Sequence, residues 1–587
     1  MHEGVLRVAN CSGFYGDRLA AMREMLEGGP VDVLTGDYLA ELTLLILGRD
    51  RMKDPTAGYA RTFVRQVEDC LGQALERGVR IVSNAGGLNP AGLAARLREV
   101  AGALGLSPTV AHVHGDDLLP RAAALGFTEG GDPLTANAYL GGFGIAAALQ
   151  EGADVVVTGR VTDASLVVGP AVAHFGWTHE DRDALAGAVA AGHVIECGAQ
   201  ATGGNFSGFD ALPREAPLGF PLAEIGSDGS SVITKHPGTG GAVTRDTVTA
   251  QLVYEIGDPR YLGPDVTLRL DSLCLTDDGP DRVKISGARG EPPPRRLKVC
   301  RNQLGGFRNS VEMVLTGLDI EAKAAWVRDQ VEAALADRRP AEVEWTLART
   351  DHADADTEEA ASCLLRVTVR DADPTVVGTS FTAAVVELGL ASYPGFSLTA
   401  PPSAATPYGV YRPGYADRGE VEHVVVHADG RAVSVPEPGE LAGDQPEVAV
   451  EDPVGAAVDG VGGEDEPAEP AARGTVRVPL GQVAHARSGD KGGDANIGVW
   501  PRESAQHPGR AAWLRDLLTP DRVRALLPEA RGLDVSVHPL PNLEAVNVVL
   551  HGLLGQGVAA SGRFDPQAKG LGEWLRARYV DVPEELL

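Results

Sequence analysis

The sequence predicts an α/β protein with a doubly wound, mostly parallel sheet, continued by an α+β lobe and followed by a small C-terminal α+β domain. Three observations predict it. Short apolar segments alternate with amphipathic ones in the N-terminal part, the 587 residues are too many for one ordinary core, and residues 436–473 are rich in Pro, Gly, Ala, Glu and Asp. We therefore expect a large unit at 1–435, an acidic flexible linker at 436–473 and a small domain at 474–587.

The N-terminal part predicts five strands separated by helices. The strands are Leu6–Ala9, Val31–Leu34, Ile81–Val82, Thr109–Val113 and Asp154–Val157. The helices are Asp17–Leu26, Tyr38–Leu47, Ala91–Leu104 and Ala136–Leu149. Because each strand is a short continuous apolar run, we expect a parallel sheet covered on both faces and joined by right-handed crossovers.

From about residue 262 the pattern changes, which predicts a second lobe continuous with the first. Its expected strands are Val266–Leu270, Arg282–Ile285, Val343–Leu347 and Leu364–Val369, and its expected helices are Ala322–Ala336 and Thr375–Leu388. The C-terminal domain is expected to contain strands Val476–Pro479, Val535–Val537 and Val546–Leu550 and the helix Pro566–Leu575.

Composition excludes several classes of protein. The formal net charge of −29 disfavours nucleic acid and anionic membranes as partners, although an acidic surface can simply keep a protein in solution. The six scattered cysteines form no pair that indicates a disulfide framework or a structural zinc site. Residues Met1–Gly4 do not resemble a signal peptide, and the apolar run Leu42–Leu47 is too short to span a bilayer. We expect a cytoplasmic protein.

Polar and glycine-rich loops follow the five predicted strands. Because ligands bind beyond the carboxyl ends of parallel strands, these loops predict a site for a small anionic ligand. The expected ligand-binding residues are Ser12, Gly13, Asn84, Gly86, Gly87, Asn89, Gly159 and Arg160. Asp37 and Asp163, in two of these loops, are candidate catalytic bases. The alternative is that Gly, Asn and Asp are ordinary turn and cap residues.

Two cysteines are candidate nucleophiles. Cys11 lies at a predicted strand end, where a following helix N-terminus would lower the pKa of its thiol, and Cys197 lies in a second glycine-rich segment. The alternative for each is a small buried apolar side chain.

A third cluster combines a cation, an imidazole and glycines. Its predicted residues are Gly203, Gly204, Lys235, Gly238, Gly240 and Gly241 as ligand-binding groups and His236 as a catalytic group. The spacing matches neither a phosphate-binding P-loop nor a dinucleotide fingerprint, so we expect no nicotinamide or flavin cofactor. Such a loop suits a carboxylate, phosphate or thioester, unless it is merely exposed to solvent. We expect it to converge with the loops at Gly13, Gly86 and Gly159 on one pocket.

The C-terminal domain carries a charged, glycine-rich motif between its first predicted strands. Its candidate site residues are Arg487, Asp490, Lys491 and Asn496. The two cations flank a glycine turn and could hold an anion, or Asp490 could simply cap the strand.

Several of these motifs together resemble one family. Residues Asn10–Asp17, Leu34–Leu42, Asn84–Pro90, Glu196–Gly204 and Lys235–Gly241 resemble the acyclic terpene utilisation (AtuA-type) family, and Arg487–Gly492 resembles the ferredoxin-like domain appended to many of its members. The term names a fold and implies no iron–sulfur cluster, which agrees with the absent cysteine spacing.

The resemblance implies a role in the breakdown of acyclic terpenes, whose intermediates are coenzyme A thioesters. It favours an enzyme that hydrates or cleaves a branched or terpenoid acyl-CoA, a lyase or hydratase. The alternative is a non-catalytic partner that binds an acyl-CoA or a carboxylase in the same pathway. We expect a homo-oligomer and no cofactor or tightly held metal, although a loosely bound Mg²⁺ is compatible with several carboxylates.

Limited proteolysis tests the predicted organisation. The first cuts should fall within residues 436–473, because this stretch has few large apolar side chains with which to offset its ordering entropy. Mass spectrometry of the earliest fragments would locate the cuts. Early cleavage within Leu6–Leu104 would contradict the boundaries.

Overall fold

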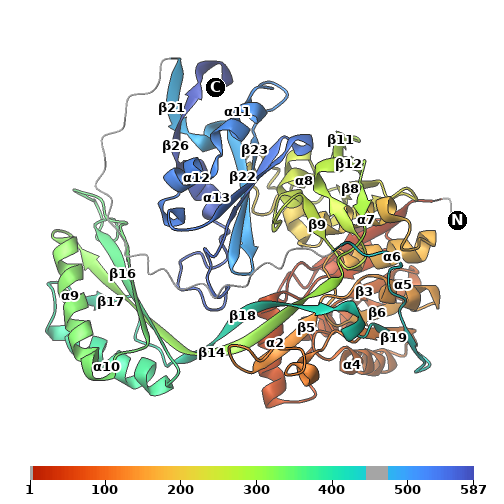
Figure 1. The fold of residues 1–587 in the computed structure, drawn as a ribbon, viewed down its shortest axis with the longest axis horizontal. Coiled ribbons are helices and arrows are strands. Elements are labelled where there is room, and N and C mark those ends of the chain that lie inside the picture. Colours follow the sequence, from red (N-terminus) through yellow and green to blue (C-terminus); the bar gives the residue numbers. More distant parts are fainter. Residues whose placement is uncertain (1–3, 444–473) are drawn as a thin grey trace.

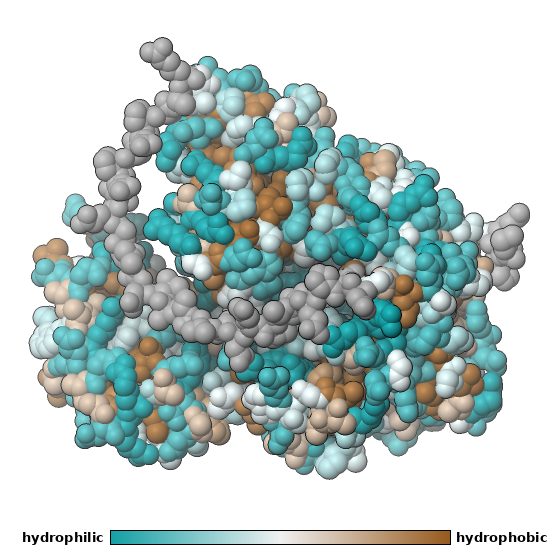
Figure 2. All heavy atoms as spheres, viewed as in Figure 1, coloured by the Kyte–Doolittle hydropathy of each residue, from teal (hydrophilic) through white to brown (hydrophobic). Residues whose placement is uncertain are grey.

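The computed structural model describes residues 4–443 and 474–587, which form three parts (Figure 1). A large α/β unit contains an eleven-stranded sheet, a lobe containing α9 and α10 lies at the end of a long two-stranded arm, and a C-terminal domain packs beside the α/β unit. The face seen in Figure 2 is mostly hydrophilic with scattered hydrophobic residues.

Five parallel strands form the centre of the large sheet. In sheet order they are β1 (Leu6–Asn10), β2 (Val33–Gly36), β3 (Arg80–Ser83), β6 (Val155–Thr158) and β4 (Val110–His114). Each is a short apolar run buried on both faces, as predicted, and their carboxyl ends share one edge of the sheet.

Antiparallel strands extend this centre on both sides, so the prediction of a mostly parallel sheet is wrong. Beyond β1 lie β7 (Pro221–Ile225), β8 (Ser231–Lys235), β12 (Arg282–Ser286) and β11 (Cys274–Asp277), and beyond β4 lie β19 (Val424–Val426) and β20 (Ala432–Ser434). The cause is local, because the tight turn Gly226–Ser230 joins β7 to β8 and a short turn makes neighbouring strands antiparallel.

Helices cover both faces of the sheet and enclose two cores. One face is packed by α1 (Ala21–Gly28), α3 (Arg61–Glu76) and α4 (Pro90–Ala103), and the other by α5 (Phe143–Gln150), α6 (Ser165–Phe175) and α7 (Arg182–Ile195). Val8 belongs to one core and Ala9 to the other, as expected for side chains that alternate along a strand.

Two helical segments differ from the prediction. Helix α3 was not expected, although Phe63 and Val67 are completely buried in it. The predicted helix Ala136–Leu149 begins instead as β5 (Pro133–Ala138), and only α5 is helical. Pairing of β5 with a distant strand, which no local pattern reveals, decides the difference.

The arm and its lobe are built around β14 (Arg296–Thr316), a strand of 21 residues. Its first half pairs with β5 and β18 (Thr406–Asp417), and its second half with β16 (Ser362–Asp371). The lobe is completed by β15 (Glu342–Ala348), β17 (Ser397–Leu398), α9 (Ile320–Leu335) and α10 (Phe381–Val386).

The second lobe therefore does not begin near residue 262. Strands β11 and β12 return to the large sheet, and β9 (Arg260–Leu262), β10 (Thr267–Arg269) and β13 (Gly290–Glu291) form a small sheet of their own. Helices α2 (Glu41–Lys53) and α8 (Arg245–Leu252) complete the large unit.

The C-terminal domain packs helices on a four-stranded antiparallel sheet. In sheet order its strands are β22 (Ala484–Lys491), β23 (Asp494–Pro501), β25 (Ala545–Leu550) and β24 (Val535–Leu540), with α11 (Arg510–Leu517), α12 (Pro520–Leu526) and α13 (Leu571–Ala577). Strands β21 (Thr475–Pro479) and β26 (Tyr579–Pro583) pair separately. The last helix begins at Leu571, five residues later than predicted.

Most of the predicted linker, 436–473, lies outside the described residues, and the domain boundaries stay predictions. In the two described stretches of chain, no helix combines the length and the apolar character needed to cross a bilayer.

Candidate functional site

Three carboxylates meet at the carboxyl edge of the parallel strands. Asp37 follows β2, Asp163 lies between β6 and α6, and Glu196 follows the last turn of α7. One carboxylate oxygen from each lies within 4.8 Å of the others. The structure thus brings the two predicted bases together and adds a third acid that the sequence did not single out.

Neighbouring loops hold these carboxylates in place. Asn84 Nδ2 donates to Asp37 Oδ1 at 2.8 Å, and the backbone N–H of Leu39 donates to the same oxygen at 3.0 Å. Asn10, at the end of β1, donates to the carbonyl of Glu196 at 3.1 Å. The loops after β1, β2, β3 and β6 therefore converge, as the sequence predicted.

Arg160 is the buried cation beside the carboxylates. Its Nη1 donates to Asp163 Oδ1 at 2.8 Å and to the Leu39 carbonyl at 2.9 Å. The guanidinium carbon lies 4.2 Å from the centre of the Tyr139 ring. The side chain of Arg160 is 3% exposed and that of Asp163 is 28% exposed, so Asp163 is where an incoming ligand can touch this pair.

Burial and mutual repulsion alter the acidity of the cluster. Burial, followed by the charge of Asp163, raises the pKa of both Asp37 and Glu196 well above the ordinary values. His193 Nδ1 lies 3.4 Å from Glu196 Oε1. Burial and Lys491 lower the pKa of His193 to about 4, so its ring is neutral at pH 7 and the contact is not an ion pair.

The arm adds Lys298 to the charged groups around the site. Lys298, on β14, lies 3.4 Å from Glu41 Oε1 and 4.7 Å from the centre of the Tyr139 ring. The Tyr139 hydroxyl donates to Glu41 at 2.6 Å. Burial would raise the pKa of Glu41, but Lys298 and Arg160 outweigh it and hold that pKa at about 2, so Glu41 is a permanent anion.

The C-terminal hairpin of β22 and β23 adds Lys491 and Asp490 to the charged groups around the site. Lys491 Nζ donates to the Glu255 carbonyl at 2.7 Å, and the Lys491 ammonium lies 5.7 Å from the centre of the Tyr261 ring. Burial and then Lys298 lower the pKa of Lys491. Burial, with the negative charges of Glu255 and Glu41, raises the pKa of Asp490 to about 8. Asp490 is therefore largely protonated at neutral pH.

Arg487 and Asn496, predicted to hold an anion, instead dock the C-terminal domain. Arg487 donates to the Asn205 carbonyl at 2.9 Å and to Gln200, and its guanidinium lies over the Tyr254 ring. Asn496, which is completely buried, donates to the Val253 carbonyl and accepts from the Glu255 N–H. Both side chains therefore bind backbone or side-chain groups of the large unit rather than an anion.

The loop Lys235–Gly241 lies beside the carboxylates rather than among them, contrary to the predicted convergence. Lys235 Nζ lies 3.2 Å from Asp281 and donates to the Thr239 carbonyl at 2.9 Å. His236 Nε2 lies 3.0 Å from the Met25 carbonyl of α1, and burial lowers the pKa of its ring. The cations that do reach the site are Arg160, Lys298 and Lys491.

Most of the predicted ligand-binding glycines pack against the protein itself. A Cβ atom on Gly86 would lie 2.4 Å from the Thr158 carbonyl, and one on Gly159 would lie 2.2 Å from Asp116. The same holds for Gly13, Gly87, Gly203, Gly204, Gly240 and Gly241, whereas Gly238 faces open space. These glycines allow segments of the chain to approach one another closely, which gives them a structural reason to lack a side chain.

Three further predicted site residues are buried or form hydrogen bonds with the backbone. Cys11 is 1% exposed, and burial raises the pKa of its thiol instead of lowering it as predicted. The following helix, α1, begins only at Ala21. Ser12 donates to the Phe14 carbonyl. Asn89 caps α4 by accepting from the Gly92 N–H at 2.9 Å.

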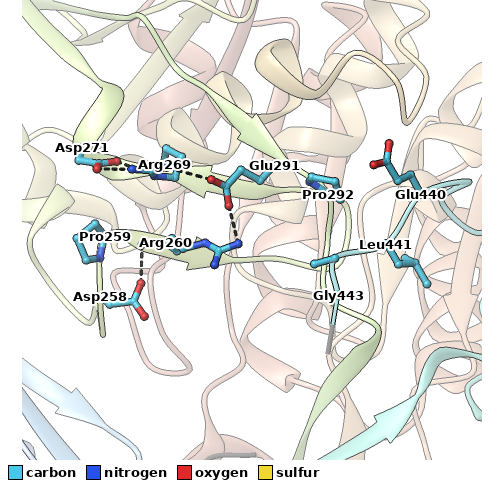
Figure 3. Close-up of a pocket in the computed structure, with 11 residues that line it drawn as sticks. Asp258, Pro259, Arg260, Arg269, Asp271, Glu291, Pro292, Glu440, Leu441 and Gly443 are labelled. Atoms are coloured by element: carbon cyan, nitrogen blue, oxygen red, sulfur yellow. Dashed lines mark hydrogen bonds and ion pairs between the residues drawn. The ribbon is translucent and has the colours of Figure 1, made fainter. Parts of the chain in front are cut away.

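A cavity of about 740 Å³ lies elsewhere in the structure (Figure 3). Its charged side chains pair with one another, with Arg269 bound to Asp271 and Glu291, and Arg260 to Glu291. The ring of Tyr261, the residue next to Arg260, lies 4.8 Å from the ring of His193 in the candidate site, tilted by 47°. We therefore place the candidate site at the carboxylates, where buried charges lack full compensation.

Comparison with known protein families identifies two regions of the chain. A model of the acyclic terpene utilisation family protein AtuA matches residues 6–427. The chain belongs to the acyclic terpene utilisation family. The AtuA ferredoxin-like domain matches residues 478–581. No curated protein matches the sequence.

The two family regions of this acyclic terpene utilisation protein contribute to one site. Asp37, Asp163, Glu196 and Lys298 come from the first region and Lys491 from the second. Glu196 opens a motif that the sequence displays, so it could have been singled out. Lys298 had no local signal, because only the pairing of β14 with β5 brings it to the site.

Replacing Asn496 by Ala tests the docking of the C-terminal domain. The change leaves the buried Val253 carbonyl and Glu255 N–H without partners, so the free energy of unfolding should fall by roughly 1–3 kcal/mol. Denaturant unfolding would measure it. The exposed Gln506→Ala in the same domain is the control, and equal losses in the two variants would contradict the docking role.

The raised pKa of Asp490 predicts a pH-dependent stability. The folded state holds a proton that the unfolded chain releases near its ordinary pKa of 3.8, so this contribution is complete below pH 3.8 and disappears as the pH rises towards 8. Asp490→Asn does not titrate. Its free energy of unfolding relative to the wild type should therefore increase between about pH 5 and pH 8. A difference that does not change with pH would contradict this assignment.

Proposed function

We propose that this protein is a catabolic enzyme that hydrates or cleaves a branched or terpenoid acyl-CoA thioester. One observation carries the proposal: carboxylates and cations from three parts of the chain meet at the carboxyl edge of the parallel strands. Family membership supports a role in acyclic terpene utilisation.

Both reactions pass through an enolate of the thioester and need two kinds of group. A base must accept a proton near the α-carbon or a hydroxyl, and positive charge must stabilise the thioester oxygen. Asp37 and Asp163 are the candidate bases, and Asp163 is the more exposed of the two. Arg160, Lys298 and Lys491 supply positive charge at the same place.

A proton donor is also present in the C-terminal hairpin. Asp490, with a pKa of about 8, keeps its proton at neutral pH and can return it to a carbanion or a leaving group. Acid and base thus come from different domains, so the docked C-terminal domain would complete the site. A purely binding partner has no need of such a pair of groups with separated pKa values.

Turnover tests the proposal. The purified chain should convert coenzyme A thioesters of branched 2-enoic or 3-hydroxy acids, with products identified by mass spectrometry. Lys298→Gln should lower kcat by roughly 100-fold, the effect of losing one donor to a developing oxyanion. Lys53→Gln, at the exposed end of α2, is the matched control.

The opposite outcome identifies the alternative function. If the thioesters raise the melting temperature but none is converted, the protein is a non-catalytic acyl-CoA-binding partner. If Lys298→Gln and Lys53→Gln behave alike, the arm does not contribute to the active site.

A further inference from the structure

The carboxylates of Asp37, Asp163 and Glu196 each have a polar side chain beside them. Asn84 donates to Asp37, Arg160 donates to Asp163, and His193 lies beside Glu196 Oε1. Carboxylates that bind a metal are oriented by such outer contacts. One carboxylate oxygen of each residue lies within 4.8 Å of the others.

Glu196 supplies an independent observation. Its residue is 7% exposed, and its Oε2 atom has no hydrogen-bond partner among the described residues. A buried carboxylate oxygen without a donor is costly, so native proteins seldom leave one unless an ion or a ligand completes it. The unpartnered oxygen belongs to a side chain that reaches into the cluster.

The nearby side-chain cations do not form ion pairs with all three carboxylates. The cluster contains three carboxylates, and Arg160 forms an ion pair with Asp163. Lys298 is paired with Glu41, and Lys491 donates to a backbone carbonyl. Among the described residues, neither Asp37 nor Glu196 forms an ion pair with a lysine or arginine side chain. When both groups are ionised, their two negative charges are the complement of one divalent cation.

We propose that Asp37, Asp163 and Glu196 bind one divalent cation of the hard class, Mg²⁺ or Mn²⁺. Cations of this class prefer oxygen ligands, and all three residues of the set offer a carboxylate oxygen. The set contains no cysteine sulfur and no histidine nitrogen, which softer metals prefer. Three protein ligands leave coordination positions for water and for an oxygen of a bound substrate. Asp163, the most exposed ligand, marks the open side.

The inference shares the site of the proposed function and refines it. A cation there polarises a carbonyl oxygen and so strengthens the stabilisation of an enolate. Asp37 and Asp163 would then serve as ligands. Asp490, on β22 of the C-terminal domain, would be the group that transfers the proton. Cation binding is measured without substrate, so the two ideas can fail separately.

Binding of Mn²⁺ alone tests the site. The full chain, treated with EDTA and dialysed, is titrated with Mn²⁺ and followed by the loss of the free-ion electron paramagnetic resonance signal. We expect one saturable equivalent that Mg²⁺ displaces. Glu196→Gln and Asp163→Asn should each weaken binding by about tenfold or more, as even outer-shell changes do at metal sites. Glu27→Gln, exposed on α1, should bind like the wild type.

The outcomes separate the two proposals. Absence of saturable Mn²⁺ binding, or equal binding by all three variants, would overturn the cation site. Circular dichroism establishes that each variant is folded, and Asp163→Asn remains informative if the buried Glu196→Gln does not fold. Binding without turnover of any thioester would keep the cation site and defeat the proposed function. Turnover that persists in EDTA would keep the proposed function and defeat the role of the cation in it.

Discussion

A guanidinium group almost completely removed from water organises the site. Leaving the charge of Arg160 unpaired in the interior would cost several kcal/mol, so the surrounding chain must supply anions, carbonyls and a ring face. Asp163, the Leu39 carbonyl and Tyr139 do so, and they come from the loops after β6, β2 and β5. The contacts that compensate the charge of Arg160 therefore also hold Asp163 and the loop after β2 in place.

The parallel centre of the sheet was predictable because short-range information determines it. Apolar runs such as Val155–Thr158 must be buried on both faces, and the helices between them leave only a few ways to achieve this. The arm was not predictable in this way. Strand β14 pairs with segments more than one hundred residues away, and the segment Pro133–Ala138 is a strand only because β14 lies beside it.

The site could be predicted as far as the sheet edge and no further. Asp37, Asp163 and Arg160 follow parallel strands, so topology alone brings them together. The glycines were assigned to a ligand because a sequence cannot distinguish close approach to a ligand from close approach to another segment, as at Gly86. Lys235 was misplaced for a related reason, since its partner Asp281 belongs to a hairpin that forms only in the folded sheet.

The length of β14 connects the lobe to the chemistry. A strand of 21 residues extends about 70 Å at 3.3 Å per residue, and it pairs with β18 over its first half and with β16 over its second. Lys298 stands near one end and the core of the lobe near the other. Bending such a ribbon sharply would break ladder hydrogen bonds, and its register with β18 shifts once, between Leu304 and Gly306. One continuous strand thus sets the position of the Lys298 backbone and that of the lobe's core, with no loop between them.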